Sequence, residues 1–286
     1  MAGVVYYTDP ACPWSWALEP TVRKLMVEFG GGLDWTFVMG GLGRSLAREP
    51  AARAALIEEW LRVSAFTQAP LDPLIWLDGP LQSTYPACMA VEAAAEQESD
   101  RGYRYLRRLR ESLMCDRRKL DHAEPLVEEG RLAGLDVERF RIDLRSNAIT
   151  EAFAADLERT TALGVRVATA EGLTKGLASR GIGGAPLPTL SFGEDGGERR
   201  EVTGFQPYDT YRAAALDIGA ETRGEGSLQI EEAIARFGRV TTREVEVLCG
   251  LPGPRAAAEL FKLAEQWRLR PLPKLTGYLW EAAEGA

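Results

Sequence analysis

Cys12 is the residue of this sequence whose type and position best suit chemistry. It follows a short apolar, β-rich run, Val4 to Thr8, and stands in a loop between Pro10 and Pro13, with apolar residues at helical spacing after it. At the start of a helix, unpaired backbone N–H groups and the helix dipole stabilise an anion. We therefore expect the pKa of the Cys12 thiol to be lowered and its thiolate to be exposed as a nucleophile. The alternative is burial as a small apolar side chain, and the two flanking prolines disfavour it.

The composition limits the kind of protein this is. The chain has 286 residues, 45% of them hydrophobic, so two domains or one domain with a large insertion are expected. Its 34 basic and 42 acidic residues give a net charge of −8, which disfavours nucleic acid and anionic membranes as partners. No run approaches the about 20 apolar residues of a membrane span, and the N-terminus lacks the pattern of an export signal. We therefore expect a cytoplasmic protein.

In a reducing cytoplasm the other cysteines, Cys88, Cys115 and Cys249, are expected to be free thiols like Cys12. Their spacing is too wide for a zinc knuckle, and the single histidine, His122, cannot complete a His-rich site, so no metal is expected. Cys115 and Cys249 lie between apolar neighbours and are interpreted as packing residues. His122 is expected at the surface or at a helix cap.

The segments around Cys12 predict a sheet interrupted by helices. After the first strand and helix, Gly30 to Gly32 ends the helix and Leu33 to Val38 alternates like a strand, which completes a βαβ unit. Long amphipathic helices fill 45–180. A hairpin is then predicted from Pro188 to Thr203, and Pro207 opens a helix through Leu216.

A charged, Gly-rich linker, Gly219 to Gly226, precedes a last segment that is predicted as helix, turn, helix and hairpin. This order suggests a winged-helix-like module. From Glu225 to Ala286, eight basic residues meet nine acidic ones, so no basic stripe for DNA stands out. We expect a module for protein contact or dimerisation, which makes a homodimer one of the expected assemblies.

The run from Tyr7 to Trp16, with its Cys-Pro-Trp-Ser motif, resembles the active-site stretch of the DsbA-like thioredoxin-fold family. The cytoplasmic branches of that family, which include FrnE-like proteins and 2-hydroxychromene-2-carboxylate isomerases, are the nearest in pattern. Gly183 to Leu190 resembles the family's cis-proline loop, and Gly204 to Tyr208 its entry into the last helix. The resemblance covers Gly3 to about Ile218.

The resemblance implies an α/β fold, a thioredoxin-like mixed sheet with a large inserted helical domain, to which the C-terminal module is added. The thioredoxin-like domain would comprise 1–44 and 181–220, the insert 45–180 and the module 226–286. Cys12 would be the catalytic nucleophile and Pro188 the cis-proline facing it. Pro13, Trp14, Leu187 and Pro188 would bind the substrate. No bound cofactor is implied.

Ser15 is the main departure from the family pattern, because it occupies the position of the second cysteine. A second thiol normally releases a mixed disulfide internally, and serine cannot do so. Release would need an external thiol, for which glutathione is a candidate co-substrate, or another cysteine such as Cys88. The Ser15 hydroxyl would also stabilise the Cys12 thiolate.

Three functions follow from these residues. The first is a thiol-disulfide oxidoreductase or disulfide isomerase that acts on a protein disulfide or a glutathione conjugate through Cys12. The second is a glutathione-dependent isomerase or transferase, although such relatives usually have serine where this chain has Cys12. The third is a non-catalytic protein-binding adaptor, which the missing second cysteine favours. Trp14, with Phe66, Trp76 and Tyr85 on an opposite wall, would supply the apolar surface for a ligand, while Trp16 is expected in the core.

We expect Ser15→Cys to convert the chain into a dithiol redox protein. Position 15 lies on the same side of the first helical turn as Cys12, where two sulfurs can reach bonding geometry. The variant should gain insulin-reduction activity that the wild type lacks, and Cys12→Ala should lose all thiol exchange. Mass spectrometry after mild oxidation should find Cys12 bonded to the introduced thiol. If that bond does not form in the folded protein, the loop is not an active-site turn of this kind.

Overall fold

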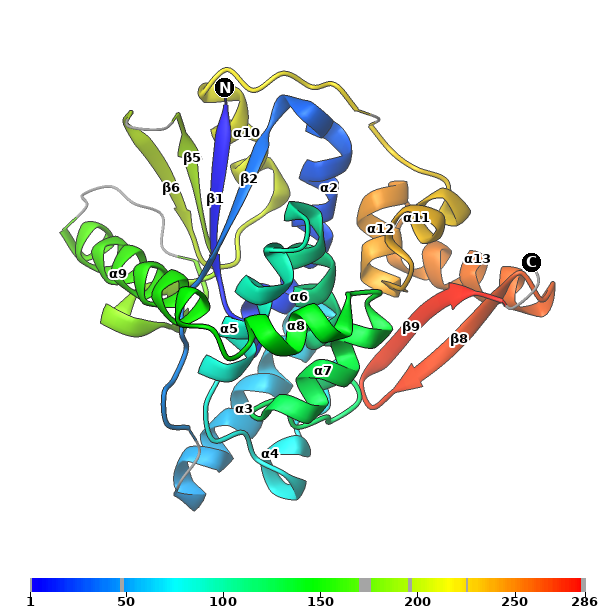
Figure 1. Ribbon diagram of the computed structural model, residues 1–286. Helices are drawn as coiled ribbons and strands as arrows, with labels where there is room; N and C mark the ends of the chain where they lie inside the picture. Colours follow the sequence, from blue (N-terminus) through cyan, green and yellow to red (C-terminus); the bar gives the residue numbers. More distant parts are fainter. Residues whose placement is uncertain (1, 47–48, 170–175, 195–196, 225, 284–286) are drawn as a thin grey trace.

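The computed structural model of the protein, shown in Figure 1, describes residues 2–46, 49–169, 176–194, 197–224 and 226–283. Within these residues no helix is both long and apolar enough to span a membrane.

A four-stranded mixed sheet is the framework on which the rest is arranged (Figure 1). Its strands, in the order β2-β1-β5-β6, are β2 Asp34–Met39, β1 Gly3–Thr8, β5 Thr189–Gly193 and β6 Arg199–Thr203. β1 runs parallel to β2 and antiparallel to β5, and β5 is antiparallel to β6. The predicted thioredoxin-like mixed sheet is therefore confirmed, and its first strand lies inside the sheet.

Alternation along β1 divides the core into two halves, because successive side chains point to opposite faces of a sheet. Val4 and Tyr6 pack with Leu25, Leu190 and other apolar residues beneath the helices α2 (Glu19–Phe29) and α10 (Tyr208–Asp217). Val5 and Tyr7 belong to a larger core shared with the helical segment. The helices that follow β1 and β2 therefore pack against the sheet and complete its core.

The single helix predicted after Cys12 is two helices, α1 (Pro13–Ala17) and α2, which meet at Leu18. Pro20 stands at the second position of α2. Since proline has no backbone N–H to continue the ladder of the preceding turn, the chain restarts there. The three glycines Gly30–Gly32 form a short 3₁₀ turn, η1, before β2.

Seven helices lie between β2 and β5 within the described residues, and they cover one end of the sheet (Figure 1). This agrees with the predicted helical character of 45–180. They are α3 Pro50–Thr67, α4 Ile75–Asp78, α5 Tyr85–Ala95, α6 Ser99–Met114, α7 Ala123–Leu132, α8 Val137–Asp143 and α9 Asn147–Thr169. Two short strands, β3 (Ser179–Arg180) and β4 (Pro186–Leu187), then pair across the 3₁₀ turn η2 (Ile182–Gly184) and lead into β5.

The last segment forms a small module of three helices and a three-stranded sheet of order β7-β9-β8, in which β8 and β9 are the predicted hairpin and β7 is an additional strand. Thr241 caps the second helix in a capping box with Glu244, and Pro254 lies in the first turn of the third. The elements are α11 Ile230–Phe237, β7 Val240–Thr241, α12 Thr242–Cys249, α13 Gly253–Glu265, β8 Leu269–Lys274 and β9 Gly277–Ala282.

The linker before this module packs against α2. The Gly224 N–H donates to the Glu28 carbonyl at 2.9 Å, and a Cβ built at Gly224 would lie 1.7 Å from the Val27 carbonyl oxygen. Only glycine permits so close an approach between two backbones. On the other side of the module, Thr276 in the β8–β9 turn exchanges hydrogen bonds with the backbone of Leu71.

A buried cluster of arginines and carboxylates joins the sheet domain, the helical segment and the module. Arg107 of α6 donates two hydrogen bonds to Glu244 of α12, at 2.7 and 3.1 Å. Arg23 of α2 lies 2.9 Å from the same carboxylate, and Arg110 of α6 pairs with Glu19 of α2. All five side chains are at most 5% exposed, so each charge depends on partners from another part of the chain.

Burial alone would raise the pKa of Glu244, but the charges of Arg107 and Arg23 outweigh it and hold that pKa below its usual range. We expect Glu244→Gln to lower the free energy of unfolding by about 3 kcal/mol, because it leaves two buried guanidinium groups short of a counter-charge. The difference from wild type should be full at neutral pH and should shrink as the pH falls from about 4.3, the ordinary pKa of a glutamate in the unfolded chain, through the lowered pKa of Glu244 in the folded protein. Urea unfolding at several pH values measures both.

Glu128→Gln is the matched control, because Glu128 pairs with Arg131 at the solvent-exposed surface. It should leave the urea midpoint unchanged within error. Equal midpoints for the two variants at pH 7 would contradict the role given to the buried cluster.

Candidate functional site

Cys12 is the N-cap residue of α1, at the point where the chain leaves β1. Its sulfur accepts a hydrogen bond from the Ser15 backbone N–H at 3.3 Å. The preceding turn is closed by the Cys12 N–H on the Asp9 carbonyl at 3.2 Å. Pro13 follows at the first helical position, where its missing N–H costs nothing. The local sequence thus places the thiol at a helix start, as predicted.

The strand β4 lies directly opposite the thiol. The Cys12 Sγ–H donates to the Leu187 carbonyl oxygen at 3.4 Å, and the peptide bond between Leu187 and Pro188 is cis. Leu187 also pairs in register with Ser179 of β3. The structure therefore brings Cys12, Leu187 and Pro188 together from positions about 175 residues apart in the chain.

The thiol is closed off, which corrects the expectation of an exposed thiolate of lowered pKa. Cys12 is 0% exposed, and Pro13, Trp14, Ser15, Leu187 and Pro188 are buried with it. Burial raises the pKa of the Cys12 thiol, although the Ser15 hydroxyl and backbone N–H and the Ser179 hydroxyl act to lower it. Removal from water penalises the charged form more than the helix start favours it. The residues predicted to bind substrate surround the thiol but have no free surface.

Ser15 contributes to the site through its side-chain hydroxyl as well as through its backbone N–H. Its hydroxyl is fully buried and makes no hydrogen bond of regular geometry with the described residues. It nevertheless favours the Cys12 thiolate, as its backbone N–H does. A buried hydroxyl with spare hydrogen-bonding capacity is suited to a thiolate or a ligand atom beside Cys12.

Asp9 organises the other side of the loop. One carboxylate oxygen accepts from the Ala11 N–H at 2.8 Å, and the other accepts from the Leu42 N–H at 2.7 Å and the Thr84 hydroxyl at 2.8 Å. Burial raises the pKa of this carboxyl against these bonds. The Cys88 thiol also donates to Asp9, at 3.4 Å, and burial and the Asp9 charge raise the pKa of Cys88 well above its usual range. Cys88 thus borders the loop as a protonated donor.

An aromatic group covers the loop from outside. Trp14 meets Phe66 and Phe205 with ring centroids 6.3 and 6.1 Å apart, and Phe66 itself is 62% exposed. Of the wall predicted for a ligand, only Phe66 is therefore in place. Trp76 packs against Trp60 in the core, and Tyr85 packs against Phe153.

Trp16 is a core residue, as expected. Its indole N–H donates to the Pro70 carbonyl at 2.9 Å, and the Arg107 guanidinium lies 4.3 Å from its ring centre.

The remaining candidates lie away from the thiol. Cys115 is buried and Cys249 partly buried, and all four cysteines are free. Burial raises the pKa of Cys249 to about 11. His122 is a surface residue beside Asp121. Among the described residues no cluster of three or more His, Cys, Asp or Glu side chains could hold a metal ion.

Three residues that shape the site, Phe205, Ser179 and Arg110, are not among the site residues expected from the sequence. Phe205 lies in the stretch whose family resemblance was noted, so its place could have been anticipated. Ser179 and Arg110 could not: Ser179 acts across the β3–β4 pair, and Arg110 donates to the Thr8 hydroxyl at the end of β1 from a helix 102 residues later. No local pattern links such positions.

We expect alkylation of Cys12 to be slow at pH 7 and to accelerate only above the about 8.5 of a free thiol, because the buried thiol stays protonated. A triple variant, Cys88→Ser, Cys115→Ser and Cys249→Ser, isolates Cys12 for iodoacetamide labelling followed by mass spectrometry. Ser15→Ala should slow the reaction further, since it removes a group that favours the thiolate. A labelling midpoint below pH 7 would contradict the closed site.

Two proteins of similar sequence span almost the whole chain. The ClpXP adapter protein SpxH of Halalkalibacterium halodurans is 28% identical over 287 residues, which cover 97% of this chain and 88% of that protein. SpxH of Bacillus subtilis is 25% identical over 98% of this chain and 88% of its own length. Both matches extend through the C-terminal module.

Solved structures share the fold over about three quarters of the chain. A Nitrosomonas europaea protein assigned as a disulfide isomerase gives a TM-score of 0.62 at 21% identity, over 76% of this chain and 96% of its own. The cytosolic disulfide reductase DsbM of Pseudomonas aeruginosa gives 0.55 at 20% identity, over 75% and 94%. A second structure of that reductase, with GSH, gives 0.53 at 20% identity, over 74% and 92%.

These similarities agree with the DsbA-like fold that the Cys-Pro-Trp-Ser motif predicted. The family model described as Thioredoxin matches residues 6–170, more than half of the sequence. The chain therefore belongs to the thioredoxin family.

Proposed function

We propose that this chain is a cytoplasmic protein-binding adaptor on a thioredoxin fold, which presents a bound protein to a protease of the ClpXP type. The observation that carries the proposal is the closed state of Cys12, whose thiol is buried, has a raised pKa and donates to Leu187. A thiol in that state is a poor nucleophile. Ser15 at the position of a second cysteine points the same way, because no thiol there can release a mixed disulfide.

The similar proteins support this proposal. The SpxH proteins are ClpXP adapters, and they match the C-terminal module as well as the thioredoxin-like part. The disulfide enzymes match only about three quarters of the chain. A function that uses the whole chain accounts for the module, which the buried cluster fixes rigidly to the rest.

Thiol-disulfide exchange is the second candidate, and the position of Cys12 favours it. The thiol lies at a helix start, where a thiolate is stabilised, and faces the Leu187–Pro188 backbone. Once the Leu187 contact opened, the Cys12 thiolate would attack one sulfur of a substrate disulfide and expel the other as a thiolate. An external thiol such as glutathione would then attack the Cys12 sulfur and release the substrate thiolate, because Ser15 cannot. A second glutathione thiolate would attack the glutathione sulfur bound to Cys12, which frees the Cys12 thiolate and forms glutathione disulfide.

The two candidates differ in their dependence on Cys12. We expect the full-length protein to accelerate degradation of at least one protein by purified ClpXP in an extract of the source cells, several-fold over ClpXP alone. Cys12→Ser should keep that acceleration, since serine also caps a helix and fills nearly the same volume. Quantitative mass spectrometry of protein half-lives gives the readout, and glutathione-coupled insulin reduction is measured in parallel.

Two outcomes would reject the adaptor. In the first, no protein is degraded faster, while insulin reduction is rapid in wild type and absent in Cys12→Ser; the exchange candidate then stands. In the second, acceleration occurs but disappears in Cys12→Ser, which would show that delivery requires a covalent bond to Cys12.

A further inference from the structure

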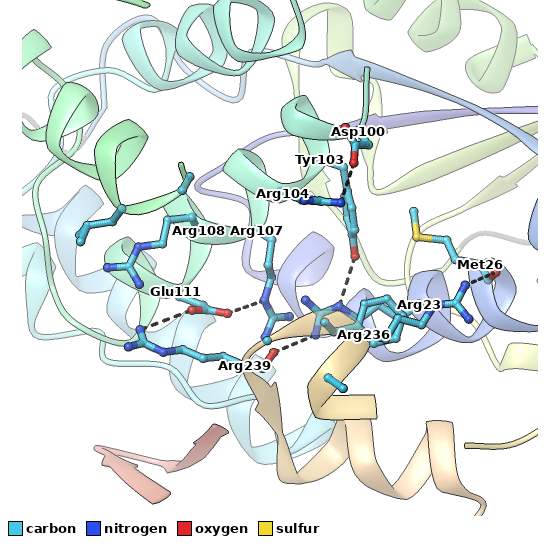
Figure 2. A pocket seen from close by; sticks show the side chains of 15 residues that line it. Arg23, Met26, Asp100, Tyr103, Arg104, Arg107, Arg108, Glu111, Arg236 and Arg239 are labelled. Carbon is cyan, nitrogen blue, oxygen red and sulfur yellow. Dashed lines mark hydrogen bonds and ion pairs between the residues drawn. The ribbon is translucent and has the colours of Figure 1, made fainter. Parts of the chain in front are cut away.

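An arginine-lined cavity of about 870 Å³ lies where α2, α6 and α11 meet (Figure 2), and Cys12 is not among its lining residues. It is thus shared by the sheet domain, the helical segment and the module. Two carboxylates line it, Asp100 and Glu111, against six arginines: Arg23, Arg104, Arg107, Arg108, Arg236 and Arg239.

Two of the arginines are fixed in the interior. Arg23 and Arg107 are 2% and 5% exposed, and both pair with the buried Glu244. Arg23 also donates to the Arg239 carbonyl at 3.0 Å. Held by several partners, these guanidinium groups cannot turn away to water, so their charge is a permanent property of the wall.

The arginines nearer to solvent keep hydrogen-bonding capacity. The guanidinium of Arg236 makes one hydrogen bond within the described part of the chain, to the Met26 carbonyl at 3.3 Å. Arg104 pairs with Asp100 at 2.7 Å and its side chain is largely exposed, and Arg108 donates through Nε to Glu129 at 2.5 Å. Each guanidinium has five N–H donors, so most of those on these three side chains remain available to a ligand.

The charge around the cavity does not balance. Six carboxylates pair with the lining arginines, and three of them are shared with further arginines behind the wall: Glu19 with Arg110, Glu129 with Arg118 and Glu281 with Arg270. Among the described residues, the group joined by these ion pairs and Arg236 has nine arginines and six carboxylates. Three positive charges are therefore in excess, in a chain whose net charge is −8.

We propose that this cavity binds clustered phosphoryl groups, either as a free polyphosphate anion or as the phosphate tail of a nucleotide. Guanidinium groups match phosphate oxygens with paired, charge-assisted hydrogen bonds. The volume lies in the range of small-molecule sites and far exceeds that of one monoatomic ion.

The aromatic rings in the wall indicate that the phosphate part provides the affinity. Tyr103 stacks on Phe37, and the guanidinium groups of Arg23 and Arg236 lie 4.6 and 5.5 Å from the centre of the Phe237 ring. Each ring is therefore already packed against a neighbouring side chain, which leaves less of it for a base.

The shape of the wall favours a small anion over an acidic peptide. The lining residues belong to helices and to the turn from Gly238 to Arg239. None belongs to a strand whose edge could pair with an extended peptide. Since three parts of the chain contribute arginines, a bound polyanion would stabilise their assembled arrangement. This site is independent of the adaptor proposal and would exist under either candidate function.

Isothermal titration calorimetry of the full-length protein with sodium tripolyphosphate tests the proposal, at about 150 mM salt where weak surface attraction is screened. We expect saturable binding of one anion per chain. Arg104→Gln and Arg236→Gln should each weaken it about tenfold, as expected for loss of a charged hydrogen-bond donor. Both side chains are exposed, so the variants should fold, which circular dichroism checks. Arg255→Gln, an exposed arginine of α13 outside the cavity, is the matched control and should bind like wild type.

Titrations with ATP and adenosine distinguish a site for a polyphosphate group alone from a nucleotide site. Equal affinity for ATP and tripolyphosphate identifies a site for a polyphosphate group alone, tighter binding of ATP identifies a nucleotide site, and both support the proposal. No binding of either anion would overturn it. The same applies if Arg255→Gln weakens binding as much as Arg236→Gln, which indicates diffuse attraction, or if a polyglutamate peptide binds more tightly than both anions.

Discussion

The structure depends on a set of almost fully buried charges. Glu19, Glu244, Arg23, Arg107 and Arg110 come from three parts of the chain and satisfy one another in the interior. Each would be costly to bury alone, so the arrangement is stable only when all three parts are docked. Arg110 also reaches the Thr8 hydroxyl at the end of β1. The cluster that binds the C-terminal module thus also contacts the end of β1, which leads into the Cys12 loop.

The site around Cys12 combines a helix start that favours a thiolate with burial that disfavours it. The helix start, the serine N–H and the facing Leu187 carbonyl are in place. The thiol is nevertheless covered, and its proton is engaged with Leu187. The two candidate functions therefore differ in the access they need to Cys12 and in what they need of the residue at position 15.

Local features were predictable from the sequence, and long-range ones were not. The strand, loop and helix around Cys12 follow from periodicity and two prolines, and the capped helix at Thr241 follows from a side chain that suits its N-cap. The break at Leu18 was not predicted, although Pro20 is a local signal for it. The burial of Cys12 depends on Leu187 and Trp14 packing across the fold, which no local pattern encodes. The arginine-lined cavity was hidden for a similar reason, because an overall charge of −8 says nothing about where individual charges gather.

The close approach of the linker to α2 at Gly224 affects whether the C-terminal module packs on its own chain or on a second copy. Gly224 lies so close to the Val27 carbonyl that any side chain there would lift the linker away from α2. A lifted linker gives the C-terminal module more free chain and a longer reach. Exchange of an identical module between two copies needs just such a released hinge. Glycine at position 224 therefore favours packing of the module on its own chain over exchange of the module with a second copy.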